Sequence, residues 1–173
     1  MATKSCTFYR CRGFSLIEML VYIGMLVFML AIIMEVVTSM SRSERAIQSL
    51  RTIENSAVSA MERIGREARQ AESINATSSI FNIHPGRVVF NSTTASGTPR
   101  TVEFYFANGT LWLKENGVDT GAITESNANT TSVVFRRFAT STVEGVRIEL
   151  TIESGTSTHY RSETFYSSAL LRQ

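Results

Sequence analysis

Cysteine is scarce in this sequence and confined to one end of it. The chain has only two cysteines, Cys6 and Cys11, and both precede a long apolar run that begins at Phe14. Without its first thirteen residues the chain has no cysteine, which excludes both a disulfide framework and a thiolate metal site. Loss of those residues also changes the formal net charge from +2 to −1, because it removes Lys4, Arg10 and Arg12. A chain so close to neutrality gives no reason, by charge alone, to expect a nucleic-acid partner.

The residues of common catalytic and metal sites are scarce too. The only aspartate is Asp119, which argues against an Asp-rich calcium loop. His84 and His159 stand alone, without the paired spacing of a zinc site, and no G-x-S-x-G elbow of a serine hydrolase occurs. We therefore expect no catalytic residue, no metal and no cofactor, and the chain is not expected to be an enzyme.

The apolar run extends from Phe14 to Val37, and its only strongly polar side chains are Ser15, Glu18 and Glu35. As a helix it would be about 36 Å long, enough to cross a hydrocarbon core of about 30 Å. It exceeds the roughly 7–15 apolar residues of a secretory signal peptide. Because the positive residues precede it, the N-terminus is expected inside the cell and the remainder outside. Length and flanks alone fit a plain signal anchor equally well.

Glu18 adds information that a plain anchor does not explain. A carboxylate at the centre of a membrane helix costs about 3 kcal/mol, and less near an end. Glu18 could reach headgroup water from the first turn, or it could have a cationic partner. Cleavage between Gly13 and Phe14 would create such a cation, an α-amino group at a similar depth in a neighbouring copy. Pairing offsets both burial costs, so Glu18 would favour assembly of subunits that are staggered along the helix axis.

The segment K-x5-R-C-R-G-F-S-L-I-E-M-L resembles the class III signal sequence of type IV pilins and type II secretion pseudopilins. The resemblance implies that a prepilin peptidase cuts after Gly13 and methylates Phe14, and that Glu18 directs filament assembly. The partners it implies are that peptidase, other pilins or pseudopilins, an inner-membrane assembly platform and the lipid bilayer. The location it implies is the bacterial cytoplasmic membrane, spanned once, with the C-terminal domain exported and later part of a filament.

Two further features make the resemblance closer to the minor subunits of this family than to the major ones. Major pilins often carry a helix-bending proline in the membrane segment, whereas the only prolines here are Pro85 and Pro99. The series Arg63-x2-Arg66-x2-Arg69 resembles a helix end that is common in J-type minor pseudopilins and W-type minor pilins. A solvated basic face is the alternative interpretation of these three arginines.

Periodicity predicts the rest of the fold. Apolar residues at steps of three and four extend the helix to about Ala71 or Ser73, and they are Ile47, Leu50, Ile53, Ala57, Met61, Ile64, Ala68 and Ala71. Alternation then predicts a hairpin at 101–113 around Asn108-Gly109, a strand at 146–153 and a last strand at about 159–167. Shorter candidate strands are 79–83, 87–91 and 132–139, and surface loops are expected at 92–98 and 119–131. The predicted fold is α+β and pilin-like, a long helix packed on an antiparallel sheet.

The sequence thus divides into a cleaved leader at 1–13, a transmembrane and assembly helix at 14–37, its amphipathic extension at 38–73 and an exported sheet domain at 74–173. The leading hypothesis is a structural minor pilin or pseudopilin of a type II secretion pseudopilus or type IV pilus-like filament. One alternative is a DNA-uptake minor pilin, in which Arg136 and Arg137, between Phe135 and Phe138, contact nucleic acid. Buried phenylalanines beside exposed arginines would explain the same pattern. The other alternative is an uncleaved, membrane-anchored binding or enzyme domain.

Overall fold

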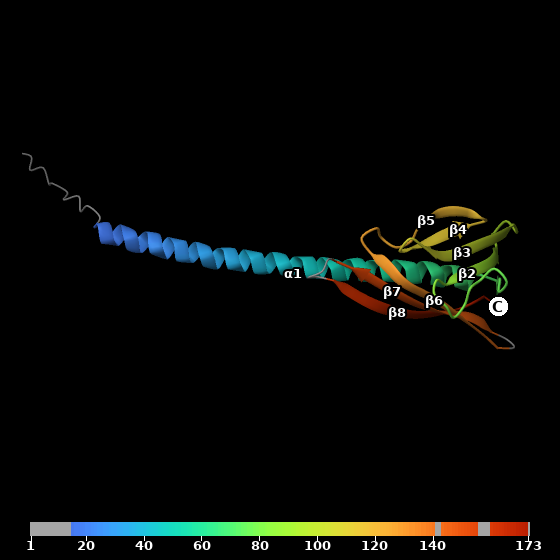
Figure 1. The fold of residues 1–173 in the computed structure, drawn as a ribbon. Helices are drawn as coiled ribbons and strands as arrows, with labels where there is room; N and C mark the ends of the chain where they lie inside the picture. The colour runs from blue at the N-terminus through green and yellow to red at the C-terminus, as the bar shows by residue number, and fades with distance from the viewer. Residues whose placement is uncertain (1–14, 141–142, 156–159, 173) are drawn as a thin grey trace, which may run out of the picture. The chain divides into compact units, whose positions relative to one another are not determined.

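The computed structural model describes residues 15–140, 143–155 and 160–172 (Figure 1). Its one long helix, α1, comprises Leu16–Gln70 and contributes to two compact units, one up to Ser43 and one from Glu44 onward. No proline interrupts these 55 residues, Glu18 lies in the first turn and Arg69 in the last, which suits the helix dipole at both ends.

α1 ends slightly before the predicted boundary. Its last residue is Gln70, whereas the sequence indicated about Ala71 or Ser73. The backbone N–H of Ala71 still donates to the carbonyl of Glu67 at 2.9 Å, but the N–H of Glu72 donates to Asn91 instead. Pairing with a strand therefore replaces the helical hydrogen bonds at this point, and the helix ends one to three residues before the expected boundary.

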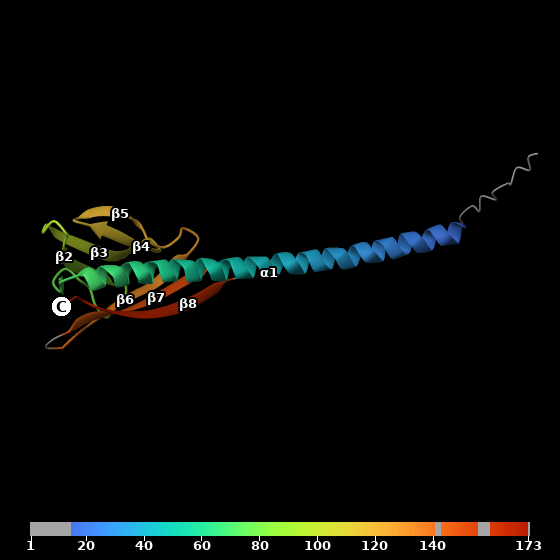
Figure 2. The ribbon, with the colours of Figure 1, turned by 180° about the vertical axis from the view of Figure 1, so that it is seen from behind.

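The described residues of the second unit form eight strands in two antiparallel sheets (Figures 1 and 2). The five-stranded sheet has the order β1-β2-β3-β4-β5, and the three-stranded sheet has the order β6-β7-β8. The strands are β1 (Ser73–Ile74), β2 (Arg87–Thr93), β3 (Pro99–Ala107), β4 (Thr110–Glu115), β5 (Val118–Ala122), β6 (Asn129–Ala139), β7 (Glu144–Ser154) and β8 (Arg161–Leu170). The α+β, pilin-like architecture is thereby confirmed, with two sheets where one was expected.

One apolar core joins the second half of α1 to both sheets. The helix contributes a stripe that is at most 1% exposed and consists largely of alanine, namely Ile53, Ala57, Ala60, Ile64 and Ala68, and Ala71 continues this stripe directly after the helix. The five-stranded sheet packs Phe90 and Phe104 into this core, and the three-stranded sheet packs Phe135 and Ile148. Small helical side chains leave room for these large residues of the strands, so the helix can lie close to them.

Two of the predicted local structures are wrong. Residues 79–83 do not form a strand, because only an isolated bridge joins Ile80 to Arg87. Residues 119–131 are not simply a loop, since they contain most of β5 and the start of β6.

The segment before β2 instead fastens the two sheets together. The N–H groups of Asn82 and Gly86 donate to the carbonyls of Phe135 and Val133 in β6, at 2.8 and 2.9 Å. Gly86 has little room for a side chain, since a Cβ atom there would lie 2.8 Å from the carbonyl oxygen of Val133. The close approach of these two backbones therefore depends on glycine at this position.

Candidate assembly segment and charged clusters

The candidate processing site lies at the start of α1. Gly13 and Phe14, the predicted cleavage and methylation residues, are outside the described part of the chain, so their roles stay predictions. α1 begins at Leu16, and the carbonyl of Ser15 accepts hydrogen bonds from the N–H groups of Glu18 and Met19, at 3.0 and 3.2 Å. Glu18 consequently lies in the first helical turn, where the unpaired N–H groups favour a negative charge.

Glu18 has one neighbour that the sequence analysis missed. The hydroxyl of Tyr22, one turn further along α1, donates to Glu18 Oε1 at 3.4 Å. That distance is long for a hydrogen bond between two oxygens, so the contact is weak. A carboxylate offers about four acceptor positions, which leaves Glu18 able to bind a second donor. The spacing of four residues was the available signal, because such pairs meet on one face of a helix.

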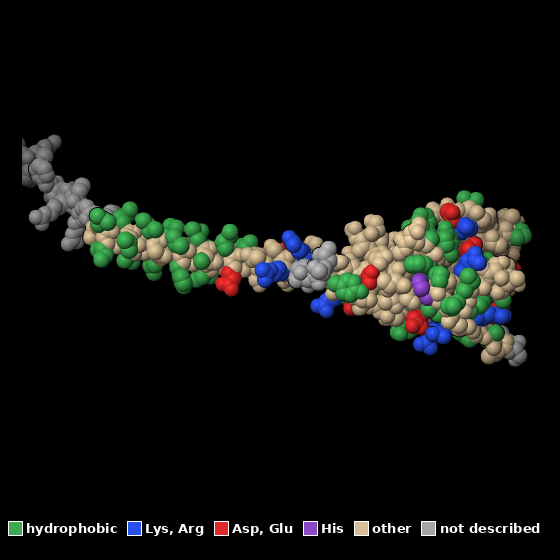
Figure 3. All heavy atoms as spheres, in the orientation of Figure 1, with side chains coloured by type: hydrophobic (Ala, Val, Ile, Leu, Met, Phe, Trp, Pro, Cys, Tyr) green, Lys and Arg blue, Asp and Glu red, His purple; other side chains and the backbone are tan. Residues whose placement is uncertain are grey.

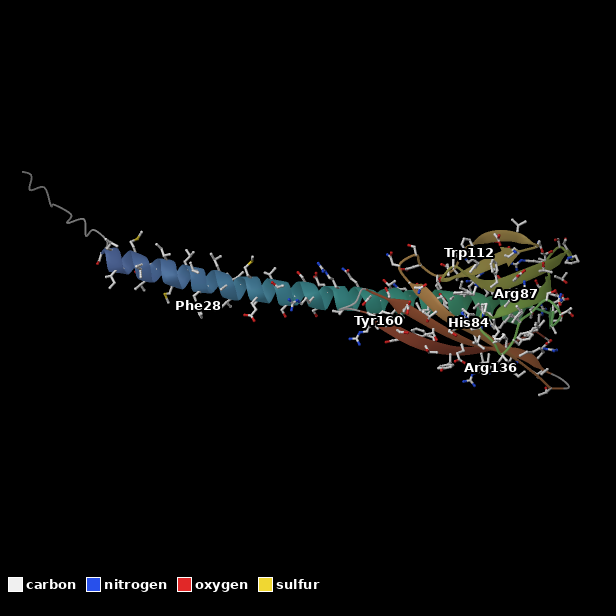
Figure 4. The ribbon with its side chains drawn as sticks, viewed as in Figure 1. Phe28, His84, Arg87, Trp112, Arg136 and Tyr160 are labelled. Carbon is white, nitrogen blue, oxygen red and sulfur yellow. The ribbon has the colours of Figure 1, made fainter. Side chains whose placement is uncertain are left out.

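The helix around Glu18 is apolar and uncovered. Every large apolar side chain from Leu16 to Val37 is at least 45% exposed, and Figure 3 shows such side chains along this stretch. Phe28, labelled in Figure 4, is 69% exposed. By length and composition α1 can cross a membrane. Contiguous apolar surface on this scale marks contact with lipid or with other proteins.

The second carboxylate of this segment, Glu35, lies 17 residues after Glu18. At 1.5 Å per residue the two are about 25 Å apart along the axis, close to the thickness of a hydrocarbon core. The residues between them carry no charge, and beyond Glu35 come Arg42 and Arg45. A bilayer that covers the uncharged stretch thus places both acids near its two faces, where a carboxylate costs least.

A cluster of four charged residues ties α1 to β3 and β4. Glu67, 4% exposed, lies 3.0 Å from Arg63 Nη2 and 2.9 Å from Arg100 Nη1. Glu115 Oε1 accepts from both arginines, at 2.8 and 2.9 Å. Two positive and two negative side chains thus neutralise each other at the edge of the core. A buried carboxylate with several charged donors can offset its loss of hydration.

The electrostatics of the cluster follow from its geometry. Burial by itself would lower the pKa of Arg100, but hydrogen bonds and attraction from Glu67, and then from Glu115, outweigh burial and raise it. Arg63 is therefore part of an ion-paired cluster and not of a solvated basic face, whereas Arg66 and Arg69 are exposed. Glu67 was missed by the sequence analysis, although its place three residues after Ile64 on the apolar stripe was a signal of a buried, paired charge.

The candidate nucleic-acid patch is divided between two environments. Phe135 is fully buried in the core, while Phe138 is 40% exposed. Arg136 lies 3.5 Å from Glu149, and Arg137 donates through Nε to Glu144. An aromatic ring that bases could stack on is thus present at only one of the two positions, and both cations already have a carboxylate beside them.

Of the two lone histidines, one is described. His84 Nδ1 accepts a hydrogen bond from the N–H of Val133 at 3.1 Å, and its ring centroid is 4.9 Å from that of Phe106. His84 thus supports the junction between the two sheets, and Figure 4 marks its position there. His159 lies outside the described residues. Within the described ranges, no three His, Cys, Asp or Glu residues come together in a way that could hold a metal ion.

Comparison with known proteins gives one match. A family model described as the prokaryotic N-terminal methylation motif matches residues 9–34. No match was found among curated proteins or among solved structures. The matched residues include Glu18 and most of the uncovered apolar stretch of α1. The methylation motif and the long apolar helix that continues from it therefore fit a type IV pilin or pseudopilin.

Proposed function

We propose that the chain is a minor subunit of a type II secretion pseudopilus or of a type IV pilus-like filament. A prepilin peptidase removes residues 1–13 and the new N-terminus at Phe14 is methylated. The first half of α1 is then transferred from lipid into a bundle of similar helices. The observation that carries this proposal is an uncovered apolar helix that continues directly from a methylation motif.

The mechanism is one of packing and charge pairing. The exposed apolar side chains of α1 can contact either lipid or the apolar helices of neighbouring subunits. Moving α1 from lipid into the helix bundle therefore costs little apolar contact. The α-amino group of one subunit meets Glu18 of another, and each charge offsets the cost of burying the other. The weak contact with Tyr22 leaves acceptor positions on Glu18 for that amine.

The unit from Glu44 onward is the exported part in this proposal. Its core holds the second half of α1 against both sheets, so it acts as a rigid head that packs beside the heads of neighbouring subunits. We assign it a structural and not a catalytic role. The arginines at Arg63, Arg66 and Arg69 and the lack of a proline from Leu16 to Gln70 favour a J-type pseudopilin over a major fibre subunit.

Mass spectrometry of the protein extracted from its own membrane tests the processing step. We expect a chain that begins at Phe14 and carries one methyl group on the terminal amine. The rival hypothesis, a membrane-anchored binding or enzyme domain, requires a chain that begins at or near Met1. An intact leader on the membrane-bound protein would therefore refute the filament hypothesis.

Substitution of Glu18 tests the charge pair. We expect Glu18→Ala to be cleaved normally but to enter filaments at least about tenfold less well, because the amine is left without its partner. Glu54→Ala, which removes an exposed carboxylate from the second half of α1, is the matched control and should assemble normally. Normal assembly of the Glu18 variant would contradict the pairing mechanism.

A further inference from the structure

The two sheets have four outer strands, and three of them have protected edges. β1 is only two residues long. β5 is five residues long, carries the exposed Asp119 and pairs with β4 through a shifted register. The edge of β6 is partly occupied, because Asn82 and Gly86 donate to its carbonyls and His84 accepts from its N–H. Short length, charge, irregular pairing and a covering loop are the usual means of blocking unwanted strand pairing.

The fourth outer strand, β8, is less protected, because its two charged residues, Arg161 and Glu163, both lie at its start. It is ten residues long, and among the described residues no hydrogen bond joins its outer edge to another segment. Residues 164–170 have the sequence Thr-Phe-Tyr-Ser-Ser-Ala-Leu, without charge, proline or glycine. Long, uncharged edges of this kind are templates for pairing with another strand.

The alternation along β8 shows which of its backbone N–H and C=O groups point away from β7. Beyond the strand, the N–H of Leu171 donates to the carbonyl of Glu144 at 2.9 Å, so odd-numbered residues bond to β7. The even-numbered residues direct their N–H and C=O groups away from β7, and all five are exposed: Ser162, Thr164, Tyr166, Ser168 and Leu170. Each supplies one backbone donor and one acceptor, so the edge presents a row of groups that have no hydrogen-bond partner among the described residues.

We infer that the outer edge of β8 receives an extended, uncharged strand from a neighbouring subunit of a different kind in the filament. This inference rests on the function proposed above, since it needs subunits packed side by side. The added strand would bond to the outward backbone groups of β8 and enlarge the sheet from three strands to four. Main-chain hydrogen bonds supply the affinity in such strand addition, and flanking side chains supply the specificity.

A second copy of β8 is a less suitable partner for this edge than a strand from a subunit of a different kind. β8 starts beside Tyr160, and two residues after its end the N–H of Arg172 donates to the carbonyl of Ala71 at 3.2 Å, just after α1 ends. β8 therefore runs in the same direction as the second half of α1 (Figure 4). Antiparallel pairing of two β8 strands would set those helix halves in opposite directions. Subunits that leave the same membrane all point in one direction, so antiparallel pairing between two copies of β8 is incompatible with their arrangement.

Amide hydrogen exchange with residue resolution tests the inference on the full-length processed chain. It is measured in detergent micelles and again in filaments that contain the chain. We expect the amides of the five outward residues to exchange about tenfold or more slowly in filaments. The amides of Phe165 and Ser167, which bond to β7, are protected in both states and serve as internal controls. Unchanged exchange at the outward amides, in filaments that do contain the chain, overturns the inference and leaves the proposed function standing.

Two variants of one residue supply an independent test. Thr164→Pro removes an outward N–H but none of the backbone hydrogen bonds to β7, and outer edges tolerate proline at such positions. Both Thr164 variants lose the hydroxyl contact with Thr151 of β7 at 2.9 Å, so that loss is the same in the two. Thr164→Ala changes the same side chain and keeps the N–H. We expect both variants to be processed, but only the proline variant to enter filaments several-fold less well. Equal incorporation of the two variants would overturn the inference, and failure of the unchanged chain to enter filaments would overturn the proposed function with it.

Cysteine crosslinking shows whether the strand beside β8 comes from another kind of subunit or from a second copy of this chain. The processed chain has no cysteine of its own, so Tyr166→Cys introduces a single thiol at the middle of the edge. We expect disulfides to cysteines placed in the other subunits of the same filament. A disulfide between two copies of this chain would show self-pairing and overturn the choice of partner.

Discussion

Replacement of Glu67 by glutamine measures how strongly the charged cluster fastens α1 to the strands. The variant keeps the size of the side chain but removes its charge and replaces one acceptor oxygen with a donor. In the native protein Arg100 donates to the two oxygens of Glu67 at 2.9 and 3.4 Å, and Arg63 lies 3.0 Å away. At least one guanidinium donor therefore loses its acceptor beside a side chain that is only 4% exposed.

The expected magnitude follows from this geometry. A hydrogen bond to a charged group contributes about 1.5–3 kcal/mol, and complete disruption of a buried ion pair costs about 3–5 kcal/mol. Arg100 is 21% exposed and keeps Glu115, so the loss should lie at the lower end. We expect the free energy of unfolding to fall by roughly 2–3 kcal/mol, which lowers Tm by about 10 °C for a unit of this size.

The assay is urea unfolding of a chain that begins at Glu44, followed by circular dichroism and by the fluorescence of Trp112. Glu62→Gln is the matched control, since it makes the same chemical change at an exposed position of the same helix. Its effect should stay within about 0.5 kcal/mol. If Glu67→Gln destabilises the protein no more than Glu62→Gln does, the cluster does not fasten α1 and the reasoning is refuted.

Three other substitutions test separate features of the unit from Glu44 onward. Ala60→Leu puts a larger side chain at a fully buried position of the α1 stripe and should cost about 1–3 kcal/mol in urea unfolding, because the core has no room for it. Gly86→Ala should also lower Tm, since its Cβ would lie 2.8 Å from the Val133 carbonyl oxygen and force β6 away; an unchanged Tm would show that the backbone there is free to move. Tyr160→Phe removes a hydrogen bond which, with that from Asn129, lowers the pKa of Glu153 against the opposing effect of burial. A lowered pKa stabilises the fold above the unfolded-state value of 4.5, so the variant should be less stable at neutral pH, and the difference should vanish as the pH falls below that value and through the lowered pKa.

Local patterns in the sequence were sufficient for the long helix and the first hairpin. The apolar spacing of α1 continues through its second half without a break, and the Asn108-Gly109 pair adopts φ angles of 52° and 73°, as a tight hairpin turn requires. Both signals involve residues that are close together in the chain. Their structural meaning therefore depends little on the rest of the fold.

The fifth strand shows where such patterns fail. Asn116-Gly117 is a second pair of the same kind, with φ angles of 49° and 82°, and it was overlooked because the residues after it have weak strand propensity. β5 forms because β4 offers it an edge to pair with, so tertiary pairing outweighs the preference of the segment itself. The division into two sheets was missed for a related reason, since it depends on long-range contacts such as those of Asn82 and Gly86 with β6.

The Glu18 site and the charged cluster illustrate the same contrast. Glu18 could be singled out because an acid in an apolar run is conspicuous in any sequence. Arg63 lies one turn before Glu67 in α1, but the other two members of the cluster, Arg100 and Glu115, come from β3 and β4, and no spacing within α1 indicates them. A site assembled from separate elements can be recognised only once the fold brings those elements together.

The alanine-rich stripe of α1 has a mechanical consequence. Its buried apolar residues within α1 run from Ile53 to Ala68, about 22 Å along the axis. Tension applied along the helix strains all of these contacts in shear at the same moment, whereas a sideways pull would separate them one after another. The second half of α1 is thus joined to the sheets in the orientation that best resists traction along its axis.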